Sequence, residues 1–319
     1  MLIFRRVFAI ALCVPALAIH GQQRQVSGPV AGYVFDGAAL RPIAGVPGGA
    51  TLGDALPLGL TAGAAAVSPQ LDSAIVIASD GSLHLFRLSG ASATEVTWNG
   101  APHGGERVVY SPSGTAAAIY AAGRVQVVGG LPNAPRTSFA AELAATAPER
   151  ASEPAGTAPA AMAVSDDAQW LLMAGQGSVR LLDATGSSSV LIEVGRAVAV
   201  AFAAGGHRAA VLNGGGPTLE VFPDVTSAPS QRMPVPGLTE PVGIAFSPDG
   251  KLLLAASRSG EAVTVFGTAA TLQCSCVPTG LTRLGNMYRL TDAASGPVWL
   301  VDMSASQPRV VFVPARANQ

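Results

Sequence analysis

A phrase of about 43 residues returns, in degraded form, along most of this chain. Its sharpest copy, VGIAFSPDGKLLLAASRSGEAVTVF at 242–266, reads as an apolar strand, a Ser-Pro-Asp-Gly turn, an unbroken apolar run, a polar turn and another strand. The same turn position falls at residues 68, 111, 165, 203, 247 and 291, so the spacings are 43, 54, 38, 44 and 44. A period of this length with several short strands per unit is typical of a β-propeller, in which radial sheets surround a central axis.

The strand chemistry of the repeat supports this fold. The second strand of each unit, 252–256 in the sharpest copy, is apolar at successive positions, which indicates burial on both faces. Pro234 and Pro236 fall in an expected outermost strand, where the missing N–H breaks no ladder. Asp80, Asp166 and Asp249 recur at the predicted turns, and we interpret them as turn residues rather than catalytic carboxylates or calcium ligands.

These observations predict an all-β chain with a single β-propeller of six blades, each of four antiparallel strands. In this interpretation the N-terminal segment around 33–36 is an outer hairpin that closes the last blade, whose other strands lie at 287–291, 298–302 and 310–313. The alternative is seven blades, with an irregular one in 28–62. An Ala-, Pro- and Glu-rich stretch at 144–159 is predicted to be a flexible surface excursion, preceded by a short helix at 139–146.

The phrase FSPDGKLLLAASRSGEAVTVF at 246–266 is similar to the repeats of bacterial YVTN-type and WD40-like propellers. The pattern extends over 28–314. The Trp-Asp dipeptide of WD40 repeats is absent, and Val-Thr-Val-Phe stands at 263–266 in place of the Tyr-Val-Thr-Asn signature. Propellers of this kind include scaffolds, receptors, lactonases, dehydrogenases and lyases, so the resemblance implies the fold and leaves the chemistry open.

The first 21 residues predict a signal peptide. Arg5 and Arg6 precede an apolar run at 7–18 that is short for a membrane span, although an uncleaved anchor is the alternative. The propeller domain then occupies 22–319 and is expected in the periplasm or outside the cell, with no further membrane span. Cys274 and Cys276 are a possible disulfide, which an oxidising compartment favours. In an extended strand their Cα atoms would lie about 6.5–7 Å apart, at the limit for a bridge, and a bulge would bring them closer.

Composition and motifs exclude several function classes. Only 12% of the residues are charged, the net charge is -1 and no basic stripe is present, so we expect no nucleic-acid partner. The chain has no Gly-x-Ser-x-Gly, His-Glu-x-x-His or P-loop motif. The predicted innermost strands are nearly all apolar. His84, His103 and His207 fall on different parts of the predicted disc, too far apart to share a metal. We therefore predict no catalytic residue, metal or cofactor.

The expected function is non-enzymatic binding of a protein or glycan partner by a monomeric propeller. The connections between units and the turns between second and third strands emerge on one side, where they gather much of the scarce charge, although loops are also polar simply because they meet water. The alternative is a lactonase-like hydrolase or a lyase acting on a small carbohydrate or lactone. The candidate ligand-binding residues are Glu240, Arg258, Glu261 and Arg283 as one patch, with Arg196, Arg107 and His103 on the same side.

Overall fold

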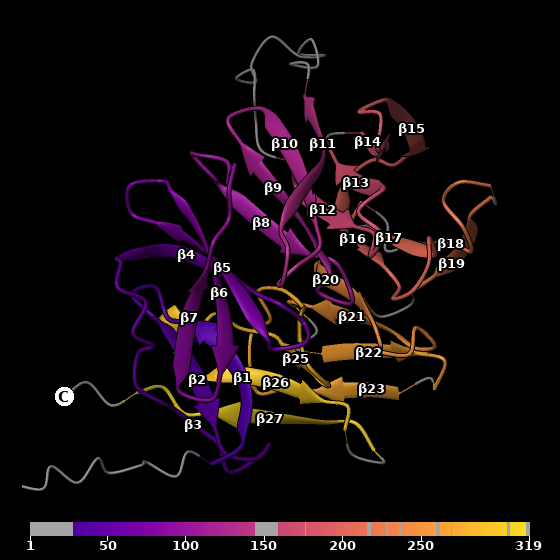
Figure 1. Ribbon diagram of the computed structural model, residues 1–319. Coiled ribbons are helices and arrows are strands. Elements are labelled where there is room, and N and C mark those ends of the chain that lie inside the picture. Colours follow the sequence, from indigo (N-terminus) through magenta and orange to yellow (C-terminus); the bar gives the residue numbers. More distant parts are fainter. Residues whose placement is uncertain are drawn as a thin grey trace, which may run out of the picture.

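The computed structural model describes residues 28–143 and 159–316, apart from 176, 216–217, 228, 236–237, 260–261, 269 and 305–306. Seven antiparallel sheets follow one another along the chain and form the blades of a propeller (Figure 1). The prediction of six blades is therefore wrong, and the seven-blade alternative describes the chain. The predicted signal peptide at 1–21 and residues 144–158 of the predicted excursion lie outside the described residues.

Blade 1 has three strands, and each of the other six has four. Blade 1 contains β1 (Val30–Phe35), β2 (Leu40–Ala44) and β3 (Thr51–Leu52). Blade 2 contains β4 (Ala62–Val67), β5 (Ser73–Ala78), β6 (Leu83–Ser89) and β7 (Ser92–Val96). Blade 3 contains β8 (Arg107–Tyr110), β9 (Ala116–Ala121), β10 (Arg124–Gly129) and β11 (Arg136–Glu142). Blade 4 contains β12 (Ala161–Val164), β13 (Trp170–Ala174), β14 (Ser178–Asp183) and β15 (Ser188–Glu193).

Blade 5 contains β16 (Ala197–Phe202), β17 (Ala209–Asn213), β18 (Thr218–Phe222) and β19 (Gln231–Pro234). Blade 6 contains β20 (Pro241–Phe246), β21 (Leu253–Ser257), β22 (Ala262–Phe266) and β23 (Ala270–Gln273). Blade 7 contains β24 (Thr282–Leu284), β25 (Met287–Arg289), β26 (Val298–Asp302) and β27 (Arg309–Val313). The described residues add one 3₁₀ turn, η1 (Ala293–Ser295), and contain no helix long and apolar enough to cross a bilayer.

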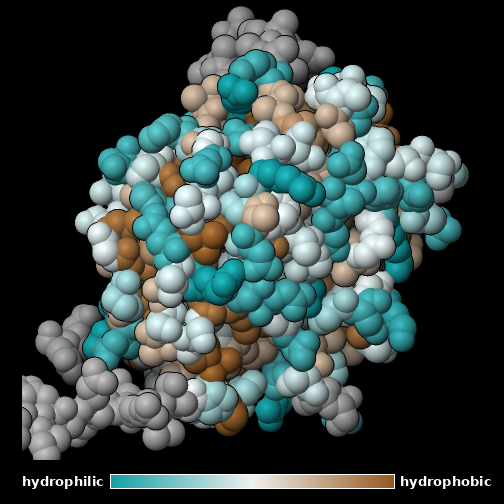
Figure 2. Space-filling model, viewed as in Figure 1, coloured by the Kyte–Doolittle hydropathy of each residue, from teal (hydrophilic) through white to brown (hydrophobic). Residues whose placement is uncertain are grey.

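The first strand of each blade lies next to the first strand of the next blade, so these strands surround the central axis. The second strands are covered on both sides, and every residue of β5 and of β21 is buried. Seven hydrophobic clusters fill the seven junctions between neighbouring blades. Figure 2 accordingly shows hydrophilic residues over most of the visible surface, with hydrophobic ones in separate small areas. Continuous apolar runs are thus required by blade-on-blade packing.

The ring closes differently from the prediction. The N-terminal segment forms a blade of its own (Figure 1). Strand β1 lies between β24 and β4. Blade 7 has its own first strand, β24, whose three residues are too few to give a sequence signal. The segment at 287–291, taken as a first strand, is instead the second strand, β25. Val34 and Ile43 of blade 1 pack against Leu284 and Met287 of blade 7, so apolar contact between these two blades closes the ring.

Strand β11 (Arg136–Glu142) occupies the start of the short helix predicted at 139–146, and residues 144–146 lie outside the described residues. The chain pairs with β10 as far as Glu142, with Val125 opposite Ala141. This ladder completes blade 3, and its hydrogen bonds outweigh the weak helical preference of an Ala-rich stretch.

The recurring turn has one hydrogen-bond pattern. A serine hydroxyl accepts the backbone N–H five residues later, at Ser111, Ser165 and Ser247. The residue that closes the turn adopts a positive φ, which Gly250 tolerates at 69° and which Ala168 adopts at 58° in a degraded copy. Asp249 accepts hydrogen bonds from the Ser247 hydroxyl and the Lys251 N–H. The repeat is therefore recognisable because each blade needs the same turn.

Candidate functional site

Two kinds of loop meet on one side of the disc. The connection before β16 pairs with the turn after β17, where the Gly214 N–H donates to the Arg196 carbonyl at 2.8 Å. The connection before β20 pairs likewise with the turn after β21, where the Arg258 N–H donates to the Glu240 carbonyl at 3.0 Å. We call this side, formed by the connections that enter the first strands and by the turns between second and third strands, the loop face.

A depression of about 370 Å³ lies on the loop face where blades 5, 6 and 7 meet. It brings together three of the seven predicted binding residues, from three separate loops. Its lining residues are Arg196, Val198, Gly214, Glu240, Pro241, Val242, Arg258 and Thr279. The sequence pattern pointed to the three charged residues because they stand next to predicted strand ends, whereas nothing in it marked Thr279.

Arg196 and Arg258 are exposed, and no hydrogen bond or ion pair of either guanidinium is found among the described residues. A guanidinium presents five N–H donors in a fixed fork that matches a carboxylate. Two cations that have no partner among the described residues thus flank Glu240, the one carboxylate in the described lining of this concave site. The described lining of the depression therefore has a net positive charge, and the N–H donors of its two guanidinium groups can bind a ligand.

Glu240 has an unusual backbone. Its φ is +46°, a region that costs a non-glycine residue about 1–2 kcal/mol. It also precedes Pro241, a position that normally requires extended backbone. The Glu240 carboxylate accepts a hydrogen bond from the Ser259 hydroxyl, and the Ser257 hydroxyl donates to the Thr239 carbonyl. Strain held in place by neighbouring hydrogen bonds is often found at binding sites, where it aims a side chain.

Arg283 does not join this depression. It lies on β24, and its side chain crosses to blade 3, where Nη1 donates to the Pro112 carbonyl at 2.9 Å. Nε donates to the Gly285 carbonyl, also at 2.9 Å. Pro112 and Gly285 both lie in turns between first and second strands, on the side opposite the loop face. The predicted grouping of Arg283 with Glu240 and Arg258 was wrong because β24 was not recognised. Glu261 lies outside the described residues.

Arg107 and His103 lie on the loop face but near blades 2 to 4. The Arg107 guanidinium donates to the backbone carbonyls of Pro159 and Ala160, which fastens blade 3 to the start of blade 4. His103 is exposed, and its backbone forms an isolated bridge with Ser82. Neither residue lines the depression, so the structure gives Arg107 a bracing role.

One hydrogen-bond chain was not predicted. Ser82 Oγ lies 2.9 Å from His84 Nε2, and His84 Nδ1 lies 2.6 Å from Glu95 Oε1, which resembles a nucleophile, base and orienting acid. However, Ser82 Oγ also lies 2.6 Å from Asp80 Oδ1, and a carboxylate can only accept. This bond lowers the pKa of Asp80. The single serine proton therefore points away from the histidine, and these residues do not line the depression. The arrangement does not favour a hydrolase.

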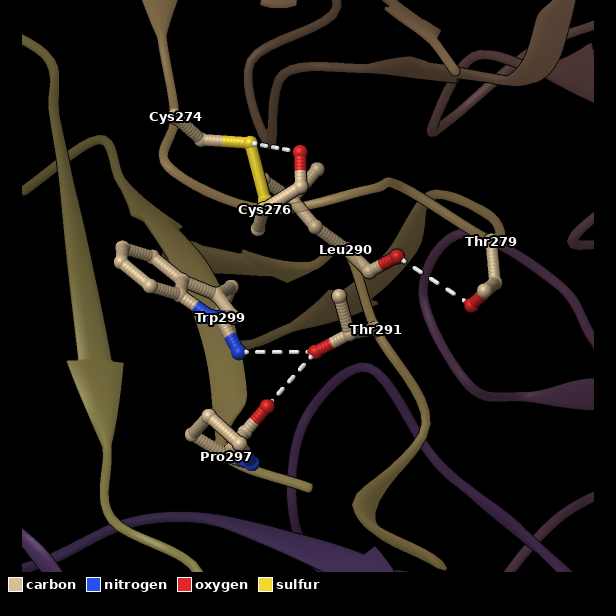
Figure 3. The surroundings of a disulfide bond; sticks show 7 residues. All are labelled: Cys274, Cys276, Thr279, Leu290, Thr291, Pro297 and Trp299. Carbon is tan, nitrogen blue, oxygen red and sulfur yellow. Dashed lines mark hydrogen bonds between the residues drawn. A yellow bond between two sulfur atoms is a disulfide. The ribbon is translucent and has the colours of Figure 1, made fainter. Parts of the chain in front are cut away.

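Cys274 and Cys276 form a disulfide in the connection between β23 and β24 (Figure 3). Their Cα atoms are 5.1 Å apart, closer than an extended strand allows, because the chain leaves β23 at Gln273 and bends at Ser275 and Cys276. Both cysteines are buried against blade 7. The same connection carries Thr279, whose hydroxyl donates to the Leu290 carbonyl at 3.3 Å. The bridge therefore fixes the turn at 274–276, three residues before the chain reaches Thr279 in the depression.

Metal ligation finds no support in the described part of the chain, where no three His, Cys, Asp or Glu side chains come together. His207 lies between β16 and β17, on the side opposite the loop face. Its Nε2 contacts Asp167 Oδ2 at 2.9 Å, and the two side chains link adjacent turns.

Comparisons with known proteins identify the fold. No protein-family model matches the chain, and no curated protein matches it in sequence. A functionally unknown protein from Desulfotomaculum acetoxidans DSM 771 is similar in structure, with a TM-score of 0.58 and 14% identity, over 88% of this chain and 94% of that one. A chain from Kuenenia stuttgartiensis hydrazine synthase gives a TM-score of 0.50 and 15% identity, over 92% and 99%. The likeness supports a propeller, but not membership of the YVTN or WD40 repeat families.

Proposed function

We propose that this chain is an exported, non-enzymatic propeller that binds a carboxylate-bearing partner, a glycan or a protein loop, in the depression between Arg196, Glu240 and Arg258. The observation that carries the proposal is a pair of guanidinium groups in one concave site, neither of which has a partner in the part of the chain that the structure describes. Such groups bind carboxylates through paired N–H···O bonds. Glu240 supplies an acceptor for a partner hydroxyl or amide, and Thr279 supplies a further hydroxyl.

The site's shape fits a surface-bound partner rather than a sequestered substrate. Arg196, Glu240, Arg258 and Thr279 are all exposed, so they can meet a chain that lies across the loop face. The Glu240 carboxylate accepts a hydrogen bond from the Ser259 hydroxyl, but Ser259 does not line the depression. Export agrees with the predicted signal peptide and with the Cys274–Cys276 bridge, because disulfides persist in oxidising compartments.

The test uses two carboxylate polymers, polygalacturonate and poly-glutamate, with neutral dextran as a comparison. We expect purified protein to bind at least one of the two acidic polymers by biolayer interferometry and not to bind dextran. The double variant Arg196→Ala/Arg258→Ala should lose affinity at least tenfold, since each charge-assisted hydrogen bond contributes about 1.5–3 kcal/mol. Failure to bind either polymer would overturn the proposal.

A matched control separates a specific site from general charge. Arg124 and Arg136 are also exposed arginines, on the outer part of blade 3, and they do not line the depression. The variant Arg124→Ala/Arg136→Ala makes the same change in net charge. We expect it to bind like the unmodified protein, and an equal loss in both double variants would mean that the attraction is not confined to the depression.

A further inference from the structure

The central channel of the ring holds a second cavity, of about 340 Å³. The first strands of all seven blades contribute to its wall, which is mainly apolar. Representative lining residues, one from each blade, are Tyr33, Ala65, Val109, Ala163, Ala201, Ile244 and Thr282. Cavities of about 300–1,000 Å³ that are mostly apolar and contain a few polar groups are the usual form of small-molecule sites.

The charged side chains that line this channel in the described part of the chain are all positive. Its charged lining residues are Arg283 and Arg289, and no described residue that lines it is acidic. Arg289 lies on a second strand but reaches the channel beside the short β24, where it pairs with Thr282. Its guanidinium is 3.7 Å from Asp292, whose side chain is 62% exposed and turned to solvent. Apolar walls around two cations focus a positive potential along the axis.

Among the described residues, Arg283 has hydrogen bonds but no ion pair, whereas Arg289 has the ion pair with Asp292 but no hydrogen bond. No carboxylate among the described residues lies within ion-pair distance of it, and its two hydrogen bonds end on backbone carbonyls. Three of its five N–H donors therefore lack an acceptor there. Burial lowers the pKa of Arg283, which reflects the cost of holding a cation away from water. An anion beside it would offset that cost.

We propose that the channel binds a small organic carboxylate, with the carboxylate group against Arg283 and an apolar body between the first strands of blades 3 to 6. The apolar wall from Val109 to Ile244 explains why the body should be apolar, and the cavity volume restricts the ligand to a small acid. Thr282, which is exposed and lines the same cavity, adds a hydroxyl. This site is separate from the depression on the loop face and does not depend on its function.

The probe is benzoate, with benzamide as its neutral counterpart of the same shape. Isothermal titration and thermal unfolding are measured at constant ionic strength, in a buffer without carboxylates. We expect benzoate to bind with one site per chain and to raise the unfolding temperature, because a ligand that binds only the folded state stabilises it. Benzamide should have at least a tenfold weaker effect. The proposal is overturned if benzoate and benzamide have equal effects. It is also overturned if benzoate shows no binding at a concentration of about 10 mM, tenfold above a millimolar Kd.

Two variants decide whether Arg283 is a ligand-binding residue or only a brace between blades 7 and 3. Arg283→Gln keeps a hydrogen-bond donor but removes the charge, and it should bind benzoate at least tenfold more weakly. Arg136→Gln makes the same charge change on β11 and should bind it normally. If Arg283→Gln fails to fold, Ala201→Leu decides instead, because it fills the channel and keeps every charge. Normal benzoate binding by a folded Ala201→Leu or Arg283→Gln protein would contradict the proposal.

Discussion

Asp166 on one side of the disc and the arginine pair of the depression on the other differ in whether they have hydrogen-bond partners. On the side opposite the loop face, the turns between first and second strands are tied to one another, and we call this side the turn face. Asp166 accepts the Ser113 N–H at 2.7 Å and the Gly205 N–H at 2.8 Å, and so joins blades 3, 4 and 5. On the loop face, Arg196 and Arg258 have no such partner among the described residues.

This contrast separates stability from binding. Polar groups that satisfy one another across blades hold the ring together, and a ligand would have to break those bonds to use them. Unpaired groups contribute little to the fold and are free to bind. Substitution of paired groups on the turn face should therefore lower the stability of the protein. Substitution of the arginine pair on the loop face should lower its affinity for a ligand.

The largest expected effect on stability is at Asp166. Asp166→Ala removes two charge-assisted hydrogen bonds that link three blades, and we expect it to lower the free energy of unfolding by about 2 kcal/mol. Urea denaturation followed by circular dichroism measures this change. The control is Asp54→Ala, whose exposed ion pair with Arg316 should contribute less than about 0.5 kcal/mol. Equal effects in the two variants would mean that the turn face does not brace the ring.

The next effect tests the strained backbone of Glu240. Glycine adopts a φ of +46° without the steric cost that a Cβ imposes, so Glu240→Gly should be more stable than Glu240→Ala by about 1 kcal/mol. Both variants lack the carboxylate, so the difference reports the backbone alone. Thermal unfolding of the two proteins measures it. If the alanine variant is equally or more stable, Glu240 is not strained.

How far the sequence predicts this structure depends on the length of the element. The second strands and their Ser-containing turns were predictable, because burial on both faces and a fixed turn geometry leave strong patterns at 247–257. Strand β24 was missed because three residues carry no pattern, and that error shifted the count of blades and misplaced Arg283. The φ of Glu240 and the convergence of Arg196 with Thr279 depend on how separate loops approach in space, which spacing does not encode.

The smallest expected effect is on how the free energy of unfolding changes at acidic pH. Burial alone would raise the pKa of Asp167, but hydrogen bonds from Ser165 and His207 leave it lowered. The Ser247 hydroxyl and the Lys251 N–H lower the pKa of Asp249. A carboxyl with a lowered pKa in the folded state stabilises the fold above its unfolded pKa of about 3.9 and loses this contribution as pH falls through its folded pKa.

We therefore expect the free energy of unfolding to decrease on acidification below about pH 4. The double variant Asp167→Asn/Asp249→Asn should show a shallower decrease, measured by urea denaturation at several pH values from 5 downwards. An identical slope in the variant and the unmodified protein would contradict the role of these two turn-face carboxylates.

The most direct measurement of the division between the faces is the affinity of Asp166→Ala and of Arg196→Ala/Arg258→Ala for the same acidic polymer, at a temperature where both are folded. If the account is right, Asp166→Ala binds polygalacturonate or poly-glutamate as the unmodified protein does, although it unfolds more easily. Arg196→Ala/Arg258→Ala keeps its stability within about 0.5 kcal/mol and loses affinity at least tenfold. The opposite result, lost affinity in Asp166→Ala and full affinity in the double arginine variant, would show that the loop face is not where this propeller binds.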